Sequence, residues 1–453
     1  MIIKKNAALI LSLSVIISLI SFFVVEDDIE RSVDIVVFST ITVFLIMYVC
    51  NKITSPVSLL IISSFVFLGS RPFISFFGNY DFRIADWFLS GDMDANVTFA
   101  NYAISLMYYG YSIGLITSRN TLAKQAIVIN RTIRKPSRKK LFFFFGIGVI
   151  GMILKGLFFF NYIETNSYVS VYSNNIQVPF GYDFLSYLFY CSFFLIVAFH
   201  QQYRTKFPFL LFAIFIAAFS AMKGSRSEFI TFFLTVVCIY YNEKNVRNIS
   251  LAVKMIVIFI IVFMLSEFVS MWRSGGNFIE LIEGNNPAVN FLYGMGVSYI
   301  SLYQSIKLGM NLIYFDVTYL FGQVIITFSS ILGIGIDLPK FSYSHLASLT
   351  ANSQLYREGY GLGGSYLSEA YLALGLVGCL LIPCLVSVIL NACEKYTKSN
   401  QYIYFIYYSC LPPILFIPRE TFLYFFPYVI KSVIITILMK LYLQLRYREY
   451  SNA

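Results

Sequence analysis

Long unbroken apolar runs alternate with short polar segments along almost the whole chain. Each run approaches the length of about 20 residues that a helix needs to cross a bilayer. The runs are continuous rather than alternating, which excludes a β-barrel and leaves helices that satisfy their own backbone hydrogen bonds in lipid. The pattern predicts twelve spans, near residues 7–25, 35–50, 55–77, 98–117, 141–160, 183–199, 207–222, 228–241, 252–270, 366–391, 401–417 and 424–441.

Two further apolar stretches, 288–306 and 317–336, are ambiguous. If both crossed the membrane, the chain would have fourteen spans. We interpret them instead as interfacial or re-entrant helices. The predicted fold class is an all-α polytopic membrane protein, with residues 1–453 forming a single membrane domain.

Composition and charge support this interpretation. Of 453 residues, 58% are hydrophobic and only 12% are charged, whereas soluble domains carry about 25% charged residues. A water-soluble enzyme, a disordered tail and a nucleic-acid binder are therefore excluded. With twelve spans and both termini in the cytoplasm, the inner side carries most of the 33 Lys and Arg and the outer side most of the 23 Asp and Glu. This is the bias that the positive-inside rule predicts, and the basic run 131–140 is a topology anchor.

The segment 271–363 is unusually long for an outer connection and is rich in Gly, Tyr, Asn and Ser. It is nevertheless too apolar to be a free loop. Long connections within compact proteins are commonly lids or binding elements. We expect short amphipathic helices that lie on the outer surface and roof a site.

Basic residues lie at the predicted outer ends of spans, against the acidic trend of that side. An arginine fork grips phosphate oxygens in two places, so this placement suits a phosphate or diphosphate. The alternative is that each cation caps a helix, pairs with a neighbouring glutamate or binds lipid headgroups. The candidates are Lys223, Arg226, Arg273, Arg357 and Arg419.

Glu369 and His345 are the candidate bases. Glu369 lies about one turn inside the tenth predicted span, where a carboxylate is costly and should face a polar site or a cation. Its alternative role is a structural ion pair with an arginine. His345 is the single histidine on the predicted outer side, within the roofing segment, and imidazole exchanges protons near neutral pH. Its alternative role is that of an ordinary surface residue.

Two motifs resemble a known family. A span ending in Lys-Gly-Ser-Arg-Ser is followed at once by another span (222–241), and Gly-Gly-Ser-Tyr-Leu-Ser-Glu-Ala-Tyr-Leu-Ala-Leu-Gly-Leu-Val-Gly occupies 363–378. Together with the late position of the long outer segment, they resemble the Wzy O-antigen or oligosaccharide repeat-unit polymerases. The resemblance covers residues 205–430, and the first 200 residues contribute topology only. The layout is similar to that of O-antigen ligases and metal-independent lipid-dependent glycosyltransferases.

The resemblance implies a transferase of the bacterial plasma membrane. Such enzymes move a growing glycan from undecaprenyl pyrophosphate onto the sugar of a second lipid-linked repeat unit, without a cofactor or a metal. By this resemblance, Arg226, Arg273 and Arg419 hold the diphosphate with support from Lys223 and Arg357. Arg226 and Arg273 would thus be catalytic together with a base, either Glu369 or His345.

The implied partners are the donor and acceptor undecaprenyl-pyrophosphate-linked glycans, membrane lipid, and in the cell a chain-length regulator and a flippase. Three alternatives stay open from the sequence. They are a lipid-linked oligosaccharide flippase or other transporter, an O-antigen ligase, and a non-enzymatic scaffold.

Overall fold

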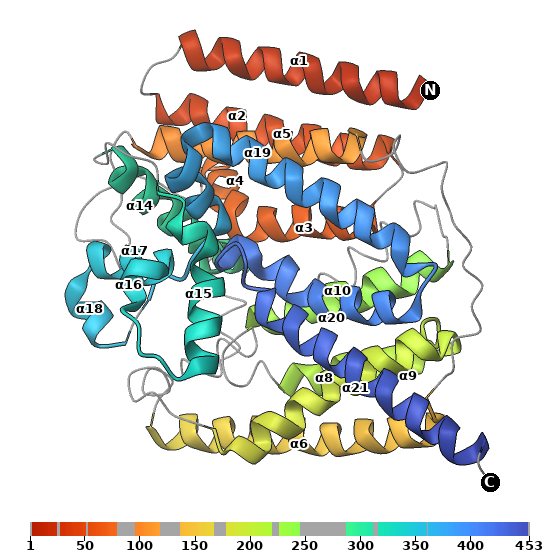
Figure 1. The fold of residues 1–453 in the computed structure, drawn as a ribbon. Coiled ribbons are helices and arrows are strands. Elements are labelled where there is room, and N and C mark those ends of the chain that lie inside the picture. The colour runs from red at the N-terminus through yellow and green to blue at the C-terminus, as the bar shows by residue number, and fades with distance from the viewer. Residues whose placement is uncertain are drawn as a thin grey trace. The chain divides into compact units, whose positions relative to one another are not determined.

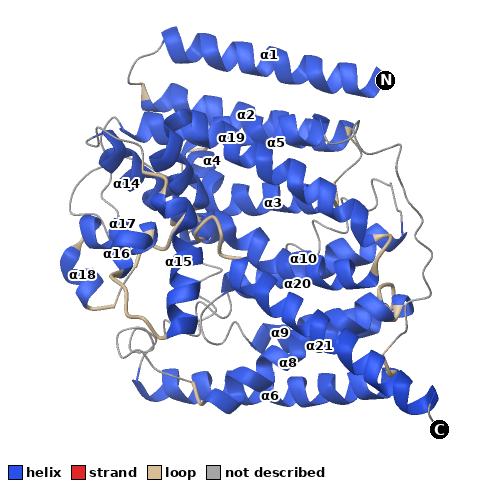
Figure 2. Cartoon of the chain, viewed as in Figure 1, coloured by secondary structure: helices blue, strands red, loops and turns tan. Residues whose placement is uncertain are grey.

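The computed structural model describes residues 2–24, 28–50, 53–78, 96–117, 136–166, 178–219, 226–244, 287–310, 316–359 and 361–451. Within these ranges the chain forms helices and loops without strands (Figures 1 and 2). The predicted all-α class is therefore confirmed for the described residues. The chain divides into two compact units, unit 1 (Met1–Ala123, Asn277–Asn391 and Leu415–Tyr424) and unit 2 (Lys124–Gly276, Ala392–Ile414 and Phe425–Ala453).

The N-terminal part of unit 1 is a set of long helices joined by polar contacts. They are α1 (Ile2–Val24), α2 (Ile29–Val49), α3 (Pro56–Ser64), the π-helical turn η1 (Phe65–Gly69), α4 (Ser70–Phe76) and α5 (Asn96–Thr117). Buried Asn101 on α5 donates to Ser32 Oγ on α2 at 2.8 Å and accepts from the Tyr299 hydroxyl at 3.0 Å. Hydrogen bonds of this kind help to hold helices together where apolar burial alone gives little specificity.

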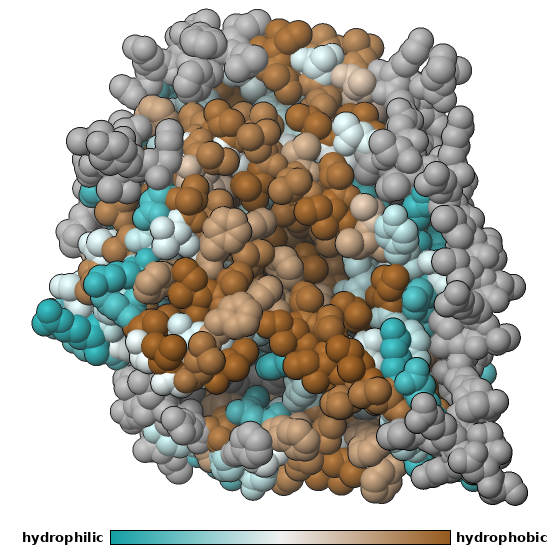
Figure 3. Space-filling view, viewed as in Figure 1, coloured by the Kyte–Doolittle hydropathy of each residue, from teal (hydrophilic) through white to brown (hydrophobic). Residues whose placement is uncertain are grey.

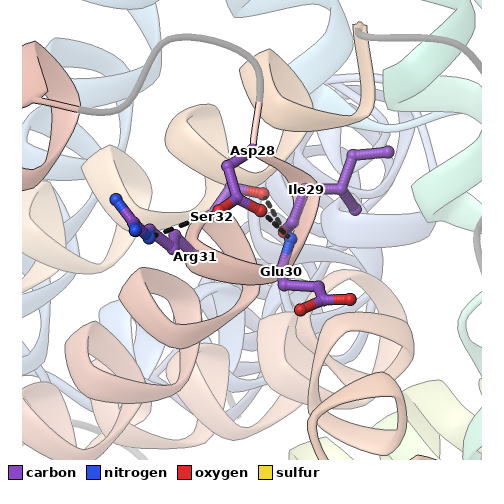
Figure 4. Close-up of polar contacts among 5 residues, drawn as sticks. All are labelled: Asp28, Ile29, Glu30, Arg31 and Ser32. Carbon is purple, nitrogen blue, oxygen red and sulfur yellow. Dashed lines mark hydrogen bonds and ion pairs between the residues drawn. The ribbon is translucent and has the colours of Figure 1, made fainter.

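Helix α2 begins at Ile29, earlier than the predicted span 35–50. The Asp28 side chain accepts from the Glu30 amide at 3.0 Å and pairs with Arg31 Nε at 3.3 Å (Figure 4). This cap satisfies an otherwise orphaned amide and favours helix formation before the apolar run starts. Hydropathy alone therefore places the start of this helix too late.

The described part of the roofing segment 271–363 is built from short helices, and its position over a site stays a prediction. They are α13 (Pro287–Met295), α14 (Ser298–Met310), α15 (Thr318–Leu332), α16 (Leu338–Phe341), α17 (Tyr343–Ala351) and α18 (Ser353–Arg357). The ambiguous stretch 288–306 is split between α13 and α14. The stretch 317–336 is interrupted where α15 ends at Gly333, in the left-handed conformation. At 1.5 Å per residue α15 is about 22 Å long, short of the hydrocarbon thickness of about 30 Å, which favours the interpretation that it does not cross.

Helix α19 (Tyr366–Thr397) folds back on itself at Gly375. Gly375 has φ 61° and ψ −151°, a region that essentially only glycine adopts. Cys379 Sγ lies 3.9 Å from the Leu367 carbonyl oxygen, whereas a straight helix would separate these residues by about 18 Å. The predicted continuous span 366–391 is therefore wrong in this respect. Residues 366–374 form a short helical arm, and 376–397 form a longer arm of about 33 Å that still suffices to cross a bilayer.

The short arm of α19 is held in place by the roofing segment. The Asp316 amide donates to the Leu372 carbonyl at 3.0 Å. Leu372 packs in a buried cluster with Tyr319 of α15 and with Tyr343 and Ala347 of α17. The roofing helices thus pack directly on the arm that carries Glu369.

Unit 2 is assembled around an antiparallel pair, α6 (Arg138–Asn166) and α8 (Phe180–Phe199) (Figure 1). An ion pair between Lys155 and Asp183 joins the two helices. Gly151 faces the α8 backbone, where an added Cβ would lie 2.6 Å from the Leu185 carbonyl carbon. The other helices of this unit are η2 (Gln201–Tyr203), α9 (Phe207–Ala218), α10 (Arg226–Lys244), α20 (Gln401–Phe416, its last two residues in unit 1) and α21 (Phe426–Ser451).

On the face shown in Figure 3, large parts of the described surface are apolar. Large hydrophobic side chains are exposed along the long arm of α19 and along α21, among them Leu381, Leu385, Ile434 and Leu438. Six described helical stretches are long and apolar enough to span a membrane: Ile29–Val49, Pro56–Phe76, Arg138–Ile163, Gly181–Phe199, Tyr366–Thr397 and Phe426–Gln444. In Tyr366–Thr397 it is the arm after the reversal at Gly375 that is long enough to cross. These features indicate a multi-pass membrane protein whose exposed apolar faces contact lipid.

The other predicted spans agree with helices where the structure describes them. The runs near 7–25, 98–117, 207–222, 228–241 and 401–417 correspond to α1, α5, α9, α10 and α20. The predicted span 252–270 lies outside the described residues. The total of twelve spans stays a prediction.

The close approach of α6 and α8 yields a stability prediction. Gly151→Ala should destabilise the protein by about 1–3 kcal/mol, because the new methyl group overlaps the α8 backbone and the helices must separate. Thermal unfolding of the detergent-solubilised protein measures the effect. Gly146→Ala on the same helix is the matched control, since nothing lies within 4 Å of its Cβ position. Equal midpoints for the two variants would contradict the proposed packing.

Candidate functional site

Glu369 is enclosed within unit 1 on the short arm of α19. Its side chain is 1% exposed. Oε2 accepts from the Phe422 amide at 2.8 Å, whereas Oε1 has no hydrogen-bond partner among the described residues. A carboxylate in such surroundings is costly unless a cation, a proton or a ligand compensates it. The expectation that Glu369 faces a polar site or a cation stays a prediction.

The Gly-Gly-Ser sequence before α19 brings a second chain segment to Glu369. Ser365 Oγ accepts from the Leu367 amide at 3.2 Å and starts the helix. Gly363 has a left-handed φ of 73°, and the Gly364 amide donates to the Arg419 carbonyl at 3.3 Å. The turn containing η4 (Ile417–Arg419) therefore lies directly against the start of the arm.

This turn carries two charged residues, Arg419 and Glu420. The negative charge of Glu420 repels the Glu369 carboxylate electrostatically. Arg419 lies over the ring of Phe67 in η1, with its guanidinium carbon 5.8 Å from the ring centre. Two residues after Arg419, the Thr421 hydroxyl donates to Gln323 Oε1 on α15 at 3.4 Å. The turn is thus tied to both the first helices and the roofing segment of unit 1.

Tyr343 on α17 completes what we call the Glu369 cluster, defined as Glu369, Tyr343, Arg419 and Glu420. The Tyr343 hydroxyl donates to the Ser301 carbonyl at 2.8 Å. Burial raises the pKa of Tyr343 well above its usual value, and the charge of Glu369 adds to this shift. The phenol therefore stays protonated and acts as a fixed donor.

His345 lies on a different face of α17 from Tyr343. Residues two apart on an α-helix point in nearly opposite directions. His345 Nδ1 is 3.0 Å from the hydroxyl of Tyr356 on α18. Burial lowers the pKa of His345 below its usual value, so the ring is neutral at pH 7. No contact between His345 and Glu369 is found among the described residues, and of the two candidate bases Glu369 is the one in the charged cluster.

The predicted cations are distributed unevenly. Arg419 belongs to the Glu369 cluster, and Arg357 is exposed at the end of α18. Arg226 is the first residue of α10, with its side chain outside the described ones. Lys223 and Arg273 lie outside the described residues. Arg226 belongs to unit 2, whereas Glu369 and Arg419 belong to unit 1.

Arg71 is a buried cation that the sequence reasoning missed. It lies in α4, directly after the π-helical turn, and is 0% exposed. Its guanidinium carbon lies 4.6 Å from the centre of the Tyr293 ring. The signal was present, because a charged residue inside the apolar run 55–77 is itself a functional-site indicator.

No group of three or more His, Cys, Asp or Glu side chains suited to a metal ion occurs in the described part of the chain. Glu369 offers one carboxylate oxygen that has no hydrogen-bond partner among the described residues, and the neighbouring turn carries the Arg419 guanidinium, which lies over Phe67. These groups are able to accept a proton from a hydroxyl and to stabilise an anionic leaving group.

These features define a helical, multi-pass membrane protein with ionisable groups enclosed in its interior. The family model of O-antigen polysaccharide polymerase Wzy matches residues 6–448, nearly the whole chain. The chain belongs to this family, which confirms the resemblance and extends it beyond residues 205–430. No curated protein and no solved structure matches the chain.

Family membership gives the protein its general activity. It is a polymerase of O-antigen repeat units, with glycosyltransferase-type chemistry on lipid-linked oligosaccharides in the membrane. This favours the polymerase over the flippase, ligase and scaffold alternatives.

The environment of His345 predicts a pH dependence of stability. Because its folded pKa lies below that of the unfolded chain, the unfolded chain binds more protons once the pH falls below about 6.5. Stability is thus present above this pH and is lost as the pH falls through the folded pKa. His345→Gln should reduce the pH dependence of the unfolding midpoint between pH 7.5 and 5.0. Tyr356→Phe removes the hydrogen bond but keeps the titrating ring, so it should retain the slope. Parallel profiles for wild type and His345→Gln would refute this assignment.

Proposed function

We propose that the protein joins undecaprenyl-diphosphate-linked repeat units at the outer face of the bacterial plasma membrane. The observation that carries this proposal is the enclosed carboxylate of Glu369, with one oxygen unoccupied among the described residues, next to the turn that bears Arg419. A polymerase needs both a proton acceptor and a fixed cation for its leaving group. The Glu369 cluster supplies both functions in one region of unit 1.

The proposed reaction is a displacement at the anomeric carbon of the donor. The acceptor sugar hydroxyl oxygen forms the new bond to this carbon, and the bond from the carbon to the diphosphate oxygen breaks. The hydroxyl proton goes to Glu369, and undecaprenyl diphosphate leaves with the electron pair. The Tyr343 hydroxyl, already bonded to a backbone carbonyl, helps to position the groups around Glu369.

Arginines are proposed to stabilise the departing diphosphate without a metal ion. A guanidinium is permanently charged and binds two phosphate oxygens at once. Arg419 is the cation for which the described contacts give support. Arg226 and Arg273 remain proposed from the sequence pattern, with Lys223 and Arg357 as supporting charges. His345 is retained as a secondary candidate base.

The orientation of the chain is proposed from its charges. With both termini in the cytoplasm, the roofing segment 271–363 lies outside, on the same side as the lipid-linked substrates. Those substrates are assembled on carriers that a flippase must deliver to this face, and a chain-length regulator would act on the growing product.

Reconstitution tests the polymerase activity directly. Purified protein in proteoliposomes, given lipid-linked repeat units, chelator and no nucleotide, should produce a ladder of polymers on a gel. The physical reason is that breaking the bond between the donor sugar and the diphosphate releases undecaprenyl diphosphate as the leaving group, whose charge the arginines stabilise. Absence of a ladder with chelator, and its restoration by a divalent cation, would refute the metal-independent scheme.

In cells, deletion of the gene should leave single-repeat glycans on the surface lipid. Loss of these single-repeat glycans as well would indicate a flippase or a ligase.

Glu369→Gln tests the proposed base. The amide keeps the size of the side chain but accepts a proton poorly, so the rate should fall by about 10²–10⁴-fold while the protein stays folded. Glu358→Gln on the exposed end of α18 is the matched control and should leave the rate unchanged. Polymer formation and unfolding midpoint are measured on the same preparations. A Glu369→Gln protein that polymerises at the wild-type rate would rule out this role.

A further inference from the structure

A second buried polar region of unit 1 surrounds Arg71, apart from the Glu369 cluster. Arg71 follows the π-helical turn Phe65–Gly69, and such turns within α-helices are frequent at functional sites. Its charge is enclosed within the apolar helix pair α3 and α4. An enclosed guanidinium in a membrane protein is costly, and such residues commonly pair with protein groups and line substrate sites.

The junction between α13 and α14 comes close to this arginine. A Cβ on Gly296 would lie 2.5 Å from Ser70 Oγ and 2.8 Å from Arg71 Cγ. Glycine at this position therefore allows the backbone to approach the stem of Arg71. Tyr293, one turn earlier, covers the guanidinium with its ring.

Two hydroxyl groups near this junction have no hydrogen-bond partner among the described residues. They are Ser70 Oγ, adjacent to Arg71, and Ser298 Oγ, two residues after Gly296. Both side chains are buried, at 0% and 1% exposure. Buried hydroxyls in native proteins are almost always hydrogen-bonded. Two such donors, on the two chain segments that meet at Gly296 and Arg71, are complementary to an anion with several oxygens.

This region is linked to Arg419 through one helical turn. Arg419 lies over Phe67, and Arg71 follows Phe67 by four residues on the same side of the helix. A diphosphate carries two anionic groups. Two arginines that lie at the same side of one helix could each bind one of these groups.

We propose that Arg71, together with the hydroxyls of Ser70 and Ser298, binds one phosphate group of the lipid-linked diphosphate, while Arg419 binds the other. This inference rests on the proposed function, because it assigns a further binding site for the same substrate. The Tyr293 ring lies over the guanidinium. Binding exchanges this ring contact for charge-assisted hydrogen bonds, which low-polarity surroundings strengthen.

The test uses farnesyl diphosphate, a short isoprenyl diphosphate, as the probe, with calorimetric titration of the full chain in nanodiscs. Farnesol shares the tail but has no charge, and it controls for binding through lipid contacts. Arg71→Gln should weaken the binding of farnesyl diphosphate by about tenfold or more, and Ser298→Ala by a few-fold. Arg31→Gln, at an exposed arginine of α2 in the same unit, should leave the affinity unchanged. Binding of farnesol should be the same in all four proteins.

Unfolding midpoints separate binding from folding. If Arg71→Gln does not fold, Ser298→Ala and Ser70→Ala carry the test, because losing a small hydroxyl should leave the fold intact. Folded variants with wild-type affinity would overturn the Arg71 site while leaving a polymerising wild-type enzyme, and so the proposed function, in place. If these variants bind farnesyl diphosphate more weakly but the wild-type protein forms no polymer, the anion site is supported and the proposed function is overturned.

Discussion

The hydrogen bond from the Phe422 amide to Glu369 Oε2 joins the two segments on which the interior of unit 1 depends. One segment is the short arm of α19, and the other is the turn after α20. Without a donor at this point, a carboxylate enclosed away from water would carry a large desolvation cost. This hydrogen bond satisfies Oε2 only. Oε1 has no hydrogen-bond partner among the described residues and can accept a proton.

The short arm is anchored from the opposite direction by a chain of hydroxyl groups. Tyr366 is the first residue of the arm. Its hydroxyl oxygen lies 2.6 Å from the Tyr111 hydroxyl oxygen, which lies 2.9 Å from Ser64 Oγ. All three side chains are buried. Together with the contact of Gly364 to the Arg419 carbonyl, these bonds hold the arm between the N-terminal helices and the roofing segment. A site built on an arm held in this way keeps its charged groups in a defined geometry, which electrostatic catalysis requires.

Much of this architecture could be predicted from the sequence. The apolar runs identified the described helices because burial in lipid demands about 20 apolar residues whatever the surroundings. The motif in 363–378 led to the correct family and to Glu369. Less could be predicted where neighbouring elements decide. His345 and Glu369 looked equivalent as bases, yet the helical direction of α17 turns His345 towards Tyr356. The sequence reasoning did not single out Arg71, and its enclosure became visible only in the packing of α13 on α4.

The sequence by itself determined the all-helical class, the membrane environment and the family, because each follows from composition, periodicity or a local motif. The tertiary structure alone decided that α19 reverses at Gly375 and which buried groups meet there. Hydropathy is a property of a segment and has the same value for a straight span and for a folded arm. The reversal depends instead on a backbone conformation available to glycine and on contacts with residues distant in the chain, such as that between Asp316 and Leu372.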